Sequence, residues 1–335
     1  MTEKILNAWY RGAWWLYLLQ PLACLYLWLR SWHIYRQPKL GKNLLPLVVI
    51  GNITVGGTGK TPLVVALVAA LKSKGLRCAI ISRGYGSKVG AGPHCVTAED
   101  NAHTVGDEPL LLSQLTGVPV VVGWRRKSSI AWLAEQKQFD LVISDDGLQH
   151  NAIKGDVEWC LLDATRGIGN GLCIPAGPLR EPATKLSQVN QVFTTGMPSS
   201  TINANIKHYM QGHTLCHLHP RLDQLKRVFD DLVVPWPDVA KPMFAVAAVG
   251  HPKRFFDDLR HRGYDVDGKG YADHYQFKEH DLPQHELIMT AKDAVKCRSW
   301  AQAKNNEPPK PWLYATQSLT IAPAQIDALL LELGL

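Results

Sequence analysis

The sequence predicts an α/β fold in which a parallel sheet is covered by helices on both faces. Short apolar runs alternate with stretches of helical periodicity along residues 41–238, which is typical of repeated strand–helix–strand units. A second series of strands and helices follows in residues 239–335, after a segment with three prolines, and predicts a second, smaller α/β lobe. Residues 1–40 are apolar and aromatic and predict an N-terminal membrane-associated helical segment.

Composition excludes several classes of protein. The 335 residues are 46% hydrophobic and 19% charged, which is typical of a globular protein with a large core. Seven cysteines occur without a C-x-x-C pair, which argues against a disulfide framework or zinc ribbon and fits a reducing compartment. The net charge is +7, but the first 42 residues hold six basic residues against one acidic residue. The rest of the chain therefore lacks a strong basic excess, and we expect no nucleic-acid partner.

An uncharged stretch, GAWWLYLLQPLACLYLWL at residues 12–29, predicts membrane attachment. As a helix it is about 27 Å long, close to the thickness of a hydrocarbon core. Trp and Tyr side chains crowd the stretch and favour the membrane–water interface. Two geometries stay open: a single span, interrupted by Gln20 and Pro21, or a bent interfacial helix whose basic flanks lie on anionic lipids. A cleaved signal peptide and a buried core helix fit less well.

A glycine-rich loop joins the first predicted strand, Leu45 to Ile50, to a helix that ends before Gly75. Strand, glycine loop and helix form the setting of a phosphate-binding P-loop. The glycines let backbone N–H groups turn toward phosphate oxygens, Lys60 would reach the β- and γ-phosphates, and the Thr61 hydroxyl would bind Mg²⁺. The predicted nucleotide-binding residues are Thr54, Val55, Gly56, Gly57, Thr58, Gly59, Lys60 and Thr61.

The loop departs from the eight-residue P-loop pattern at its first position, where Thr54 stands in place of glycine. Its spacing is similar to the variant K-G-G-x-G-K-[ST] of a class of P-loop ATPases, with Val55 in place of the first lysine. The predicted fold is therefore P-loop NTPase-like.

A second segment supports the nucleotide site. The apolar run in FDLVISDDGLQH, residues 139–150, ends in Asp145 and Asp146. An aspartate at the end of a strand beside a P-loop is a usual partner of Mg²⁺. The predicted metal ligands are therefore Thr61, Asp145 and Asp146.

The remaining elements follow from the same periodicities. In the first domain we expect strands at residues 76–82, 118–123, 157–163 and 191–195, a helix at 125–137, and a loop at 216–220. In the smaller lobe we expect strands at residues 243–250, 286–290 and 312–319, helices at 251–263 and 323–333, and a loop at 305–311. Ligands of such parallel sheets bind at the carboxyl ends of the strands.

A kinase needs a group that orients or deprotonates the acceptor hydroxyl, whereas an ATPase needs one that positions water. The candidates are Asp107, Glu108, His150, His251 and His274. Asp107 has the best local setting, because VGDEP places a carboxylate on a tight turn at the start of a helix.

The chain resembles the tetraacyldisaccharide 4′-kinase family of lipid A synthesis. The resemblance rests on GNITVGGTGKTP, SRGYG, VGDEP, DDGLQH, GNGLCIPAGPLREP, VGHPKRFFDDLR, DHYQF and MTAKDAVKC, in this order along nearly the whole chain. It implies transfer of the γ-phosphate of ATP, with Mg²⁺, to the 4′-hydroxyl of a tetraacylated glucosamine disaccharide 1-phosphate. It also implies a monotopic enzyme on the cytoplasmic face of the bacterial inner membrane.

The resemblance also assigns roles to residues. Lys60 and Thr61 match the phosphate and Mg²⁺ residues, and Asp107 matches the proposed catalytic carboxylate. His274 in DHYQF matches a histidine proposed to raise the basicity of that carboxylate, with His251 as the alternative. Further matches are Asp145 and Asp146 for the metal, with Gln149 and His150 beside them in the same motif as candidate substrate residues, and Arg83, Arg180 and Glu181 near the substrate. Phosphoryl transfer also needs a cation on the moving group, and we expect Arg83 to supply it.

An anchored enzyme suits such an acceptor, because extracting acyl chains from a bilayer costs about 0.8 kcal/mol per exposed CH₂. Two alternatives share the nucleotide features: a membrane-associated ATPase or GTPase switch without a lipid acceptor, and a non-enzymatic membrane scaffold. No obligatory protein partner is predicted.

Overall fold

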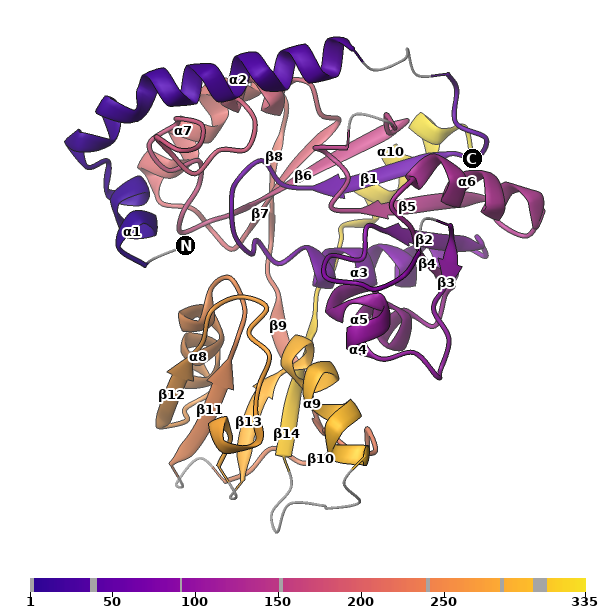
Figure 1. Ribbon diagram of the computed structural model, residues 1–335, viewed down its shortest axis with the longest axis vertical. Coiled ribbons are helices and arrows are strands. Elements are labelled where there is room, and N and C mark those ends of the chain that lie inside the picture. The colour runs from indigo at the N-terminus through magenta and orange to yellow at the C-terminus, as the bar shows by residue number, and fades with distance from the viewer. Residues whose placement is uncertain are drawn as a thin grey trace.

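A computed structural model describes residues 3–36, 41–90, 92–150, 153–238, 242–283, 286–303 and 312–335 of the chain. The loop predicted at residues 305–311 lies outside the described residues. The described chain forms two lobes, each built on one sheet, with a long N-terminal helix across the larger lobe (Figure 1).

The larger lobe contains an eight-stranded sheet in the order β3-β4-β2-β5-β1-β6-β7-β8, parallel except at β3. Its strands are β1 (Leu47–Gly51), β2 (Cys78–Ser82), β3 (His94–Cys95), β4 (Val120–Val122), β5 (Leu141–Asp145), β6 (Val157–Asp163), β7 (Gln191–Thr195) and β8 (Leu215–Leu218). Alternate residues of β1 belong to two different core clusters, with Val48 and Ile50 on one face and Leu47 and Val49 on the other. Burial on both faces explains why these strands are continuous apolar runs.

Helices cover both faces of this sheet. They are α3 (Lys60–Ser73), α4 (Ala102–Val105), α5 (Asp107–Thr116), α6 (Arg126–Glu135), η2 (Ala183–Ser187) and α7 (Ser200–Met210). The strands predicted at 157–163 and 191–195 are present with those bounds. The loop predicted at residues 216–220 is wrong in part, because Cys216 to Leu218 belong to the edge strand β8, which pairs with β7.

The smaller lobe contains a six-stranded sheet in the order β10-β9-β14-β13-β11-β12. Its elements are β9 (Arg221–Arg227), β10 (Val233–Val234), β11 (Met243–Ala247), α8 (Pro252–His261), β12 (Val266–Gly270), η3 (Glu279–Asp281), β13 (Leu287–Thr290), α9 (Ala291–Ala303) and β14 (Trp312–Ser318). The second sheet begins at Arg221, earlier than the expected boundary at residues 233–242, because β9 pairs antiparallel with β14. The last helix, α10 (Pro323–Leu333), returns to the larger lobe, where Asp327 accepts a hydrogen bond from Lys74 at 2.8 Å.

The N-terminal segment forms α1 (Glu3–Arg11), η1 (Trp14–Leu19) and α2 (Gln20–Tyr35). The chain bends by 97° between α1 and the η1–α2 unit, at Gly12, whose φ of +67° is left-handed. Pro21 does not break the helix as expected, because it lies in the first turn of α2, where its missing N–H is tolerated. Among the described residues no single helix is long and apolar enough to cross a membrane; only the bent pair reaches that length and composition.

Candidate active site

The P-loop follows β1 at the centre of the larger sheet. Gly56 and Gly59 have φ values of +103° and +84°, and Gly59 precedes the first turn of α3 without a side-chain cap. The backbone N–H groups at this helix start are therefore available to an anion. Thr54 and Val55 pair with the segment 178–179, since Val55 N donates to the Pro178 carbonyl at 2.8 Å. This pairing holds the first two residues of the loop against the segment 178–179.

The carboxylates predicted as metal ligands lie beside the P-loop lysine. Lys60 Nζ is 3.2 Å from Asp146 Oδ1, and this ion pair holds the pKa of Asp146 at about 2. Asp145 is buried at the end of β5, and burial together with the nearby Glu108 raises its pKa to about 7. Three carboxylates, Glu108, Asp145 and Asp146, thus lie close together beside the P-loop. A hard divalent cation with oxygen ligands fits this donor set, with Asp145, Asp146 and the Thr61 hydroxyl as the residues that would hold it.

A buried arginine shapes the turn after β5. Arg126 is 1% exposed, and its guanidinium donates to Ser144 Oγ at 2.9 Å and to the carbonyls of Asp145 and Asp146 at 2.9 and 3.1 Å. Asp146 has a left-handed φ of +49°, which is costly for a residue with a Cβ. The arginine therefore holds a strained turn that aims the Asp146 carboxylate at Lys60.

We expect Arg126→Met to lower the free energy of unfolding by about 3 kcal/mol, because three buried acceptors lose their donor. Urea denaturation at pH 7 measures the change. The control is Arg77→Met, which removes a solvent-exposed pair with Asp140 and should cost much less, because solvent screens such pairs. Equal costs for the two variants would contradict the role of Arg126.

Asp107 is the first residue of α5 and is 6% exposed. His274 of the smaller lobe lies against it, with Nδ1 3.4 Å from Asp107 Oδ2. Lys296 Nζ is 3.9 Å from the same oxygen. Burial of Asp107 opposes its ionisation, but His274 and the two nearby lysines prevail and keep the pKa of the carboxylate below its usual value. His274 is thus one of the groups that stabilise the ionised form of Asp107, and its role in raising the basicity of that carboxylate stays a prediction.

The alternative histidine lies elsewhere in the interface between the lobes. His251 Nδ1 is 3.5 Å from Asp163 Oδ2 at the end of β6, and Arg254 Nη1 is 3.7 Å from the same atom. These contacts lower the pKa of Asp163 to about 2. The adjacent Gly250 touches the P-loop so closely that a Cβ there would lie 2.2 Å from the nitrogen of Gly57. The loop before α8 thus packs directly on the phosphate-binding backbone.

Three of the four residues expected near the acceptor, Gln149, Arg180 and Glu181, lie between the P-loop and α2. Gln149 Nε2 donates to Glu181 Oε1 at 2.8 Å, and Arg180 Nη1 is 3.5 Å from Asp146 Oδ2. Arg30 of α2 completes the chain of contacts, since its Nη2 is 2.7 Å from Glu181 Oε2. A continuous polar network therefore joins the N-terminal helix to Asp146 and, through it, to Lys60.

The other two predicted residues sit at the edge of this network. Burial together with Arg126 and Arg83 lowers the pKa of His150 to about 4, so His150 is neutral at pH 7. Arg83 follows β2 and is exposed, and among the described residues it has no hydrogen bond or ion pair. The structure places it near His150 and Arg126 and records no contact between Arg83 and Lys60.

Several residues of the site were not predicted. Two of them are lysines of α9, Lys292 and Lys296, which lie beside Glu108 and Asp107 at the start of α5. The others are Asp163, which faces Arg254 of α8, and Arg126, which donates to the Asp145 carbonyl. The lysines occur in MTAKDAVKC, where a spacing of four places both on one face of a helix that starts directly after a strand. That spacing is a sequence signal that indicates two lysines on one helix face. No motif near Asp163 or Arg126 in the sequence indicates a functional residue.

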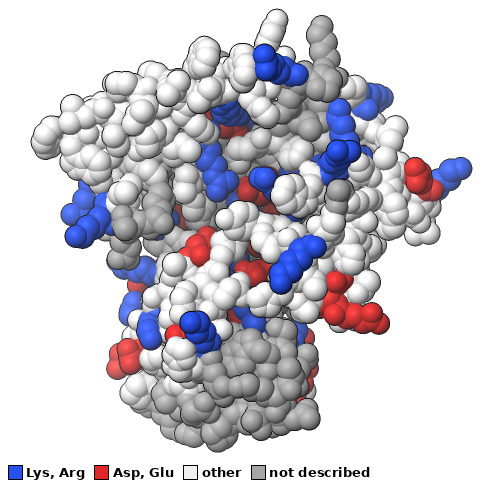
Figure 2. Space-filling view, in the orientation of Figure 1, with Lys and Arg blue, Asp and Glu red and all other residues white. Residues whose placement is uncertain are grey.

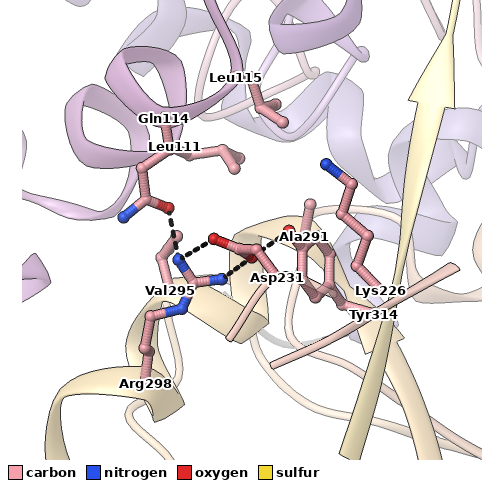
Figure 3. Close-up of a pocket in the computed structure, with 9 residues that line it drawn as sticks. All are labelled: Leu111, Gln114, Leu115, Lys226, Asp231, Ala291, Val295, Arg298 and Tyr314. Carbon is pink, nitrogen blue, oxygen red and sulfur yellow. Dashed lines mark hydrogen bonds and ion pairs between the residues drawn. The ribbon is translucent and has the colours of Figure 1, made fainter. Parts of the chain in front are cut away.

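Basic and acidic side chains gather in the hollow between the lobes, while the surface over α2 is mostly uncharged (Figure 2). A small cavity of about 60 Å³ lies where α5 meets α9 (Figure 3). Within it, Arg298 of α9 donates to Gln114 Oε1 of α5 at 3.2 Å and also binds Asp231. The α5–α9 contact is therefore a seam between the two lobes.

The chain is similar to known proteins over nearly its whole length. A family model described as tetraacyldisaccharide-1-P 4′-kinase (LpxK) matches residues 13–334. A tetraacyldisaccharide 4′-kinase of Pseudomonas fluorescens is 40% identical over 308 residues, which cover 90% of this chain and 89% of that protein. One of Psychrobacter cryohalolentis is 40% identical over 315 residues, with coverage of 88% and 84%. The crystal structure of LpxK from Aquifex aeolicus in complex with ATP shares the fold, with a TM-score of 0.75 at 24% identity over 95% of this chain and 99% of that one.

Proposed function

Since the chain belongs to the tetraacyldisaccharide-1-P 4′-kinase family, we propose that Asp107, Lys60 and the Asp145–Asp146 turn carry its reaction. The protein is an ATP-dependent kinase of lipid A biosynthesis that phosphorylates a hydroxyl group. The observation that supports the proposed roles is the position of Asp107 opposite His274 in the interface of the two lobes, with the P-loop in the same interface. The acceptor is the tetraacyldisaccharide 1-phosphate, and its 4′-hydroxyl would lie at Asp107.

In this proposal the sugar oxygen attacks the γ-phosphorus of ATP, the bond from that phosphorus to the β–γ bridging oxygen breaks, and ADP leaves. Asp107 orients the hydroxyl and accepts its proton. Lys60 leaves Asp146 for the γ-phosphate, and the N–H groups at the start of α3 hold the phosphate chain. Mg²⁺, when bound at Thr61, Asp145 and Asp146, neutralises charge on the phosphate oxygens. Arg83 is the candidate arginine for charge on the moving group, because it follows β2 at the same edge of the sheet.

The assay that tests the function uses purified full-length protein in detergent with ATP labelled at the γ-phosphate. The kinase proposal predicts little hydrolysis until the disaccharide lipid is added, and then one ADP formed for each phosphorylated lipid. A membrane-associated ATPase or GTPase switch would instead hydrolyse nucleotide at the same rate without lipid. Brisk hydrolysis without acceptor would therefore contradict the kinase proposal.

We further propose that α2 lies on the cytoplasmic face of the inner membrane as a monotopic anchor. One side of the N-terminal segment is buried against the larger lobe, with Trp9 4% and Leu16 0% exposed, whereas Trp14 and Trp28 are 75% and 62% exposed. Exposed tryptophans on a helix that is already docked on a globular lobe favour an interfacial position. The basic flanks of the segment would lie on anionic headgroups. The network from Arg30 to Asp146 would then set the height of the site above the lipid.

We expect the triple variant Leu22→Glu, Trp28→Glu and Trp32→Glu to lose sedimentation with vesicles that contain anionic lipids, because three charges replace the apolar face. The matched control puts the same charges at exposed apolar positions outside the N-terminal segment, Met197→Glu, Leu232→Glu and Leu331→Glu. A triple α2 variant that sediments as the control does would refute the anchor.

A further inference from the structure

Lys292, on the first turn of α9, joins groups from both lobes. Its Nζ is 3.0 Å from Glu108 Oε1 of the larger lobe, 3.4 Å from Asp273 Oδ1 and 3.5 Å from His274 Nε2. The side chain is 14% exposed. An ammonium group has three N–H donors, and here each of the three faces an acceptor.

These contacts determine which nitrogen of His274 carries the proton. An ionised Asp107 carboxylate only accepts, so the ring nitrogen that faces it, Nδ1, must be the donor. In the neutral ring Nε2 then has the lone pair, and that lone pair faces the ammonium group of Lys292. The two contacts select one tautomer, because exchanging the proton to Nε2 would break both hydrogen bonds.

Charged groups surround the His274 ring besides the ammonium group of Lys292. The carboxylate oxygens of Asp107 and Asp273 lie 3.4 and 3.9 Å from its ring nitrogens. The other charged groups near the ring are Glu108, bound to Lys292, and Lys296, bound to Asp293. The Tyr85 ring lies against the imidazole with centroids 5.3 Å apart.

The packing of α5 on α9 places these groups opposite each other. Asp107 and Glu108 start α5, and Lys292 and Lys296 lie on the first turns of α9. About two turns further along, Gln114 of α5 faces Arg298 of α9 across the cavity of Figure 3. The Lys292–Glu108 pair is therefore the end of the seam that lies nearest to Asp107.

We propose that Lys292 is a positioning residue that joins the lobes at Glu108 and holds His274 as the Nδ1–H tautomer. The His274 N–H and Lys296 both face Asp107 Oδ2. Among the described residues no hydrogen bond to Asp107 Oδ1 is found, so this oxygen is left for the acceptor hydroxyl. The inference about catalysis rests on the proposed role of Asp107. The inference about the tautomer of His274 is independent of that role.

The first test is ¹⁵N NMR of the full-length protein in detergent micelles, with labelled histidine and the His274→Gln variant for assignment. We expect a protonated Nδ1 and an unprotonated Nε2 for His274 at pH 8. The variant Lys292→Met should show a mixture of tautomers, Lys292→Arg should restore the Nδ1–H form, and the exposed Lys207→Met is the control. A wild-type spectrum with Nε2–H overturns the proposal, and that measurement is valid even if Lys292→Met does not fold.

The second test is steady-state kinetics with the disaccharide lipid and ATP. We expect Lys292→Met to lower kcat about 10- to 100-fold, the range seen when a group that supports a site residue is lost, with little change in the KM for ATP. Lys292→Arg should recover most of the lost kcat, because a guanidinium group also donates to Glu108 and to His274 Nε2. A loss of kcat that Lys292→Arg does not recover, or a raised KM for ATP at an unchanged kcat, overturns the proposal. The two proposals can fail separately. If Asp107→Asn keeps full activity while Lys292→Met still shows a mixture of His274 tautomers, the proposed role of Asp107 fails and the positioning role of Lys292 stands.

Discussion

Lys60→Ala should lower kcat by about 10³-fold or more, the largest effect we expect from a single substitution. The Lys60 ammonium stands 3.2 Å from Asp146 at the start of α3, and the neighbouring carboxylates keep its pKa raised despite burial. Its loss removes the one cation at the P-loop that the proposal assigns to the γ-phosphate. It also leaves Asp146 with the more distant Arg180, 3.5 Å away, so negative charge would repel the phosphate chain.

Radiolabelled phosphate transfer to the lipid measures this effect, with thermal melting as the check on folding. Lys72→Ala is the matched control, because Lys72 lies on the same helix but bonds the Thr116 carbonyl at 2.8 Å, away from the P-loop. Its activity should stay within about twofold of wild type, since surface substitutions act weakly. If Lys60→Ala retains more than a tenth of wild-type activity, Lys60 does not bind the transferring phosphate.

Asp107→Asn is the second large effect, with an expected loss of about 10²- to 10⁴-fold in kcat, the usual contribution of a general base. Asparagine keeps the size of the side chain and fits the first turn of α5, but its amide does not accept a proton. The KM for ATP should change little, because Asp107 belongs to α5 and the proposed nucleotide site is the loop before α3. Single-turnover transfer with saturating ATP separates the chemical step from binding.

The control for this variant is Asp267→Asn, a carboxylate on the exposed strand β12. It should leave both kcat and the KM unchanged. Should Asp107→Asn raise the KM for ATP at an unchanged kcat, Asp107 would belong to the nucleotide site and not to the acceptor site. The depressed pKa of Asp107 adds a further expectation: the carboxylate is ionised throughout pH 5–9, so an acid limb in this range belongs to another group.

The two sheets show which elements are visible in the sequence. The strands β6 and β7 and the helix α10 have the predicted bounds, because each is an apolar run with polar or turn residues at its ends. The strand β12, VDGKG, is mostly exposed and has no apolar pattern; it forms because parallel pairing with β11 satisfies its backbone. The strand β9 depends in the same way on β14, and this pairing moves the start of the smaller lobe to Arg221.

The residues of the site also differ in whether a local sequence motif or the tertiary structure reveals them. The P-loop and the Asp145–Asp146 turn can be located from the sequence, since each is a short motif within one strand–loop segment; their roles stay predictions. Asp107 and His274 are 167 positions apart, and only their resemblance to a family linked them before the fold was known. The contact between His274 and Asp107 is observed, whereas the effect of His274 on the basicity of that carboxylate stays a prediction. The tertiary structure also distinguishes His251 from His274, since both follow strands of the smaller lobe. His274 contacts Asp107, whereas His251 contacts Asp163.

By itself, the sequence determined the α/β class, the phosphate-binding loop and the apolar N-terminal helix, because hydrophobic periodicity and glycine-rich turns act between near neighbours in the chain. The tertiary structure decided the extent of the second sheet and the meeting of Asp107, His274 and Lys292. These features depend on contacts between residues far apart in the chain, whose strength is set by packing and burial. No local pattern encodes the distance between two charges that belong to different lobes.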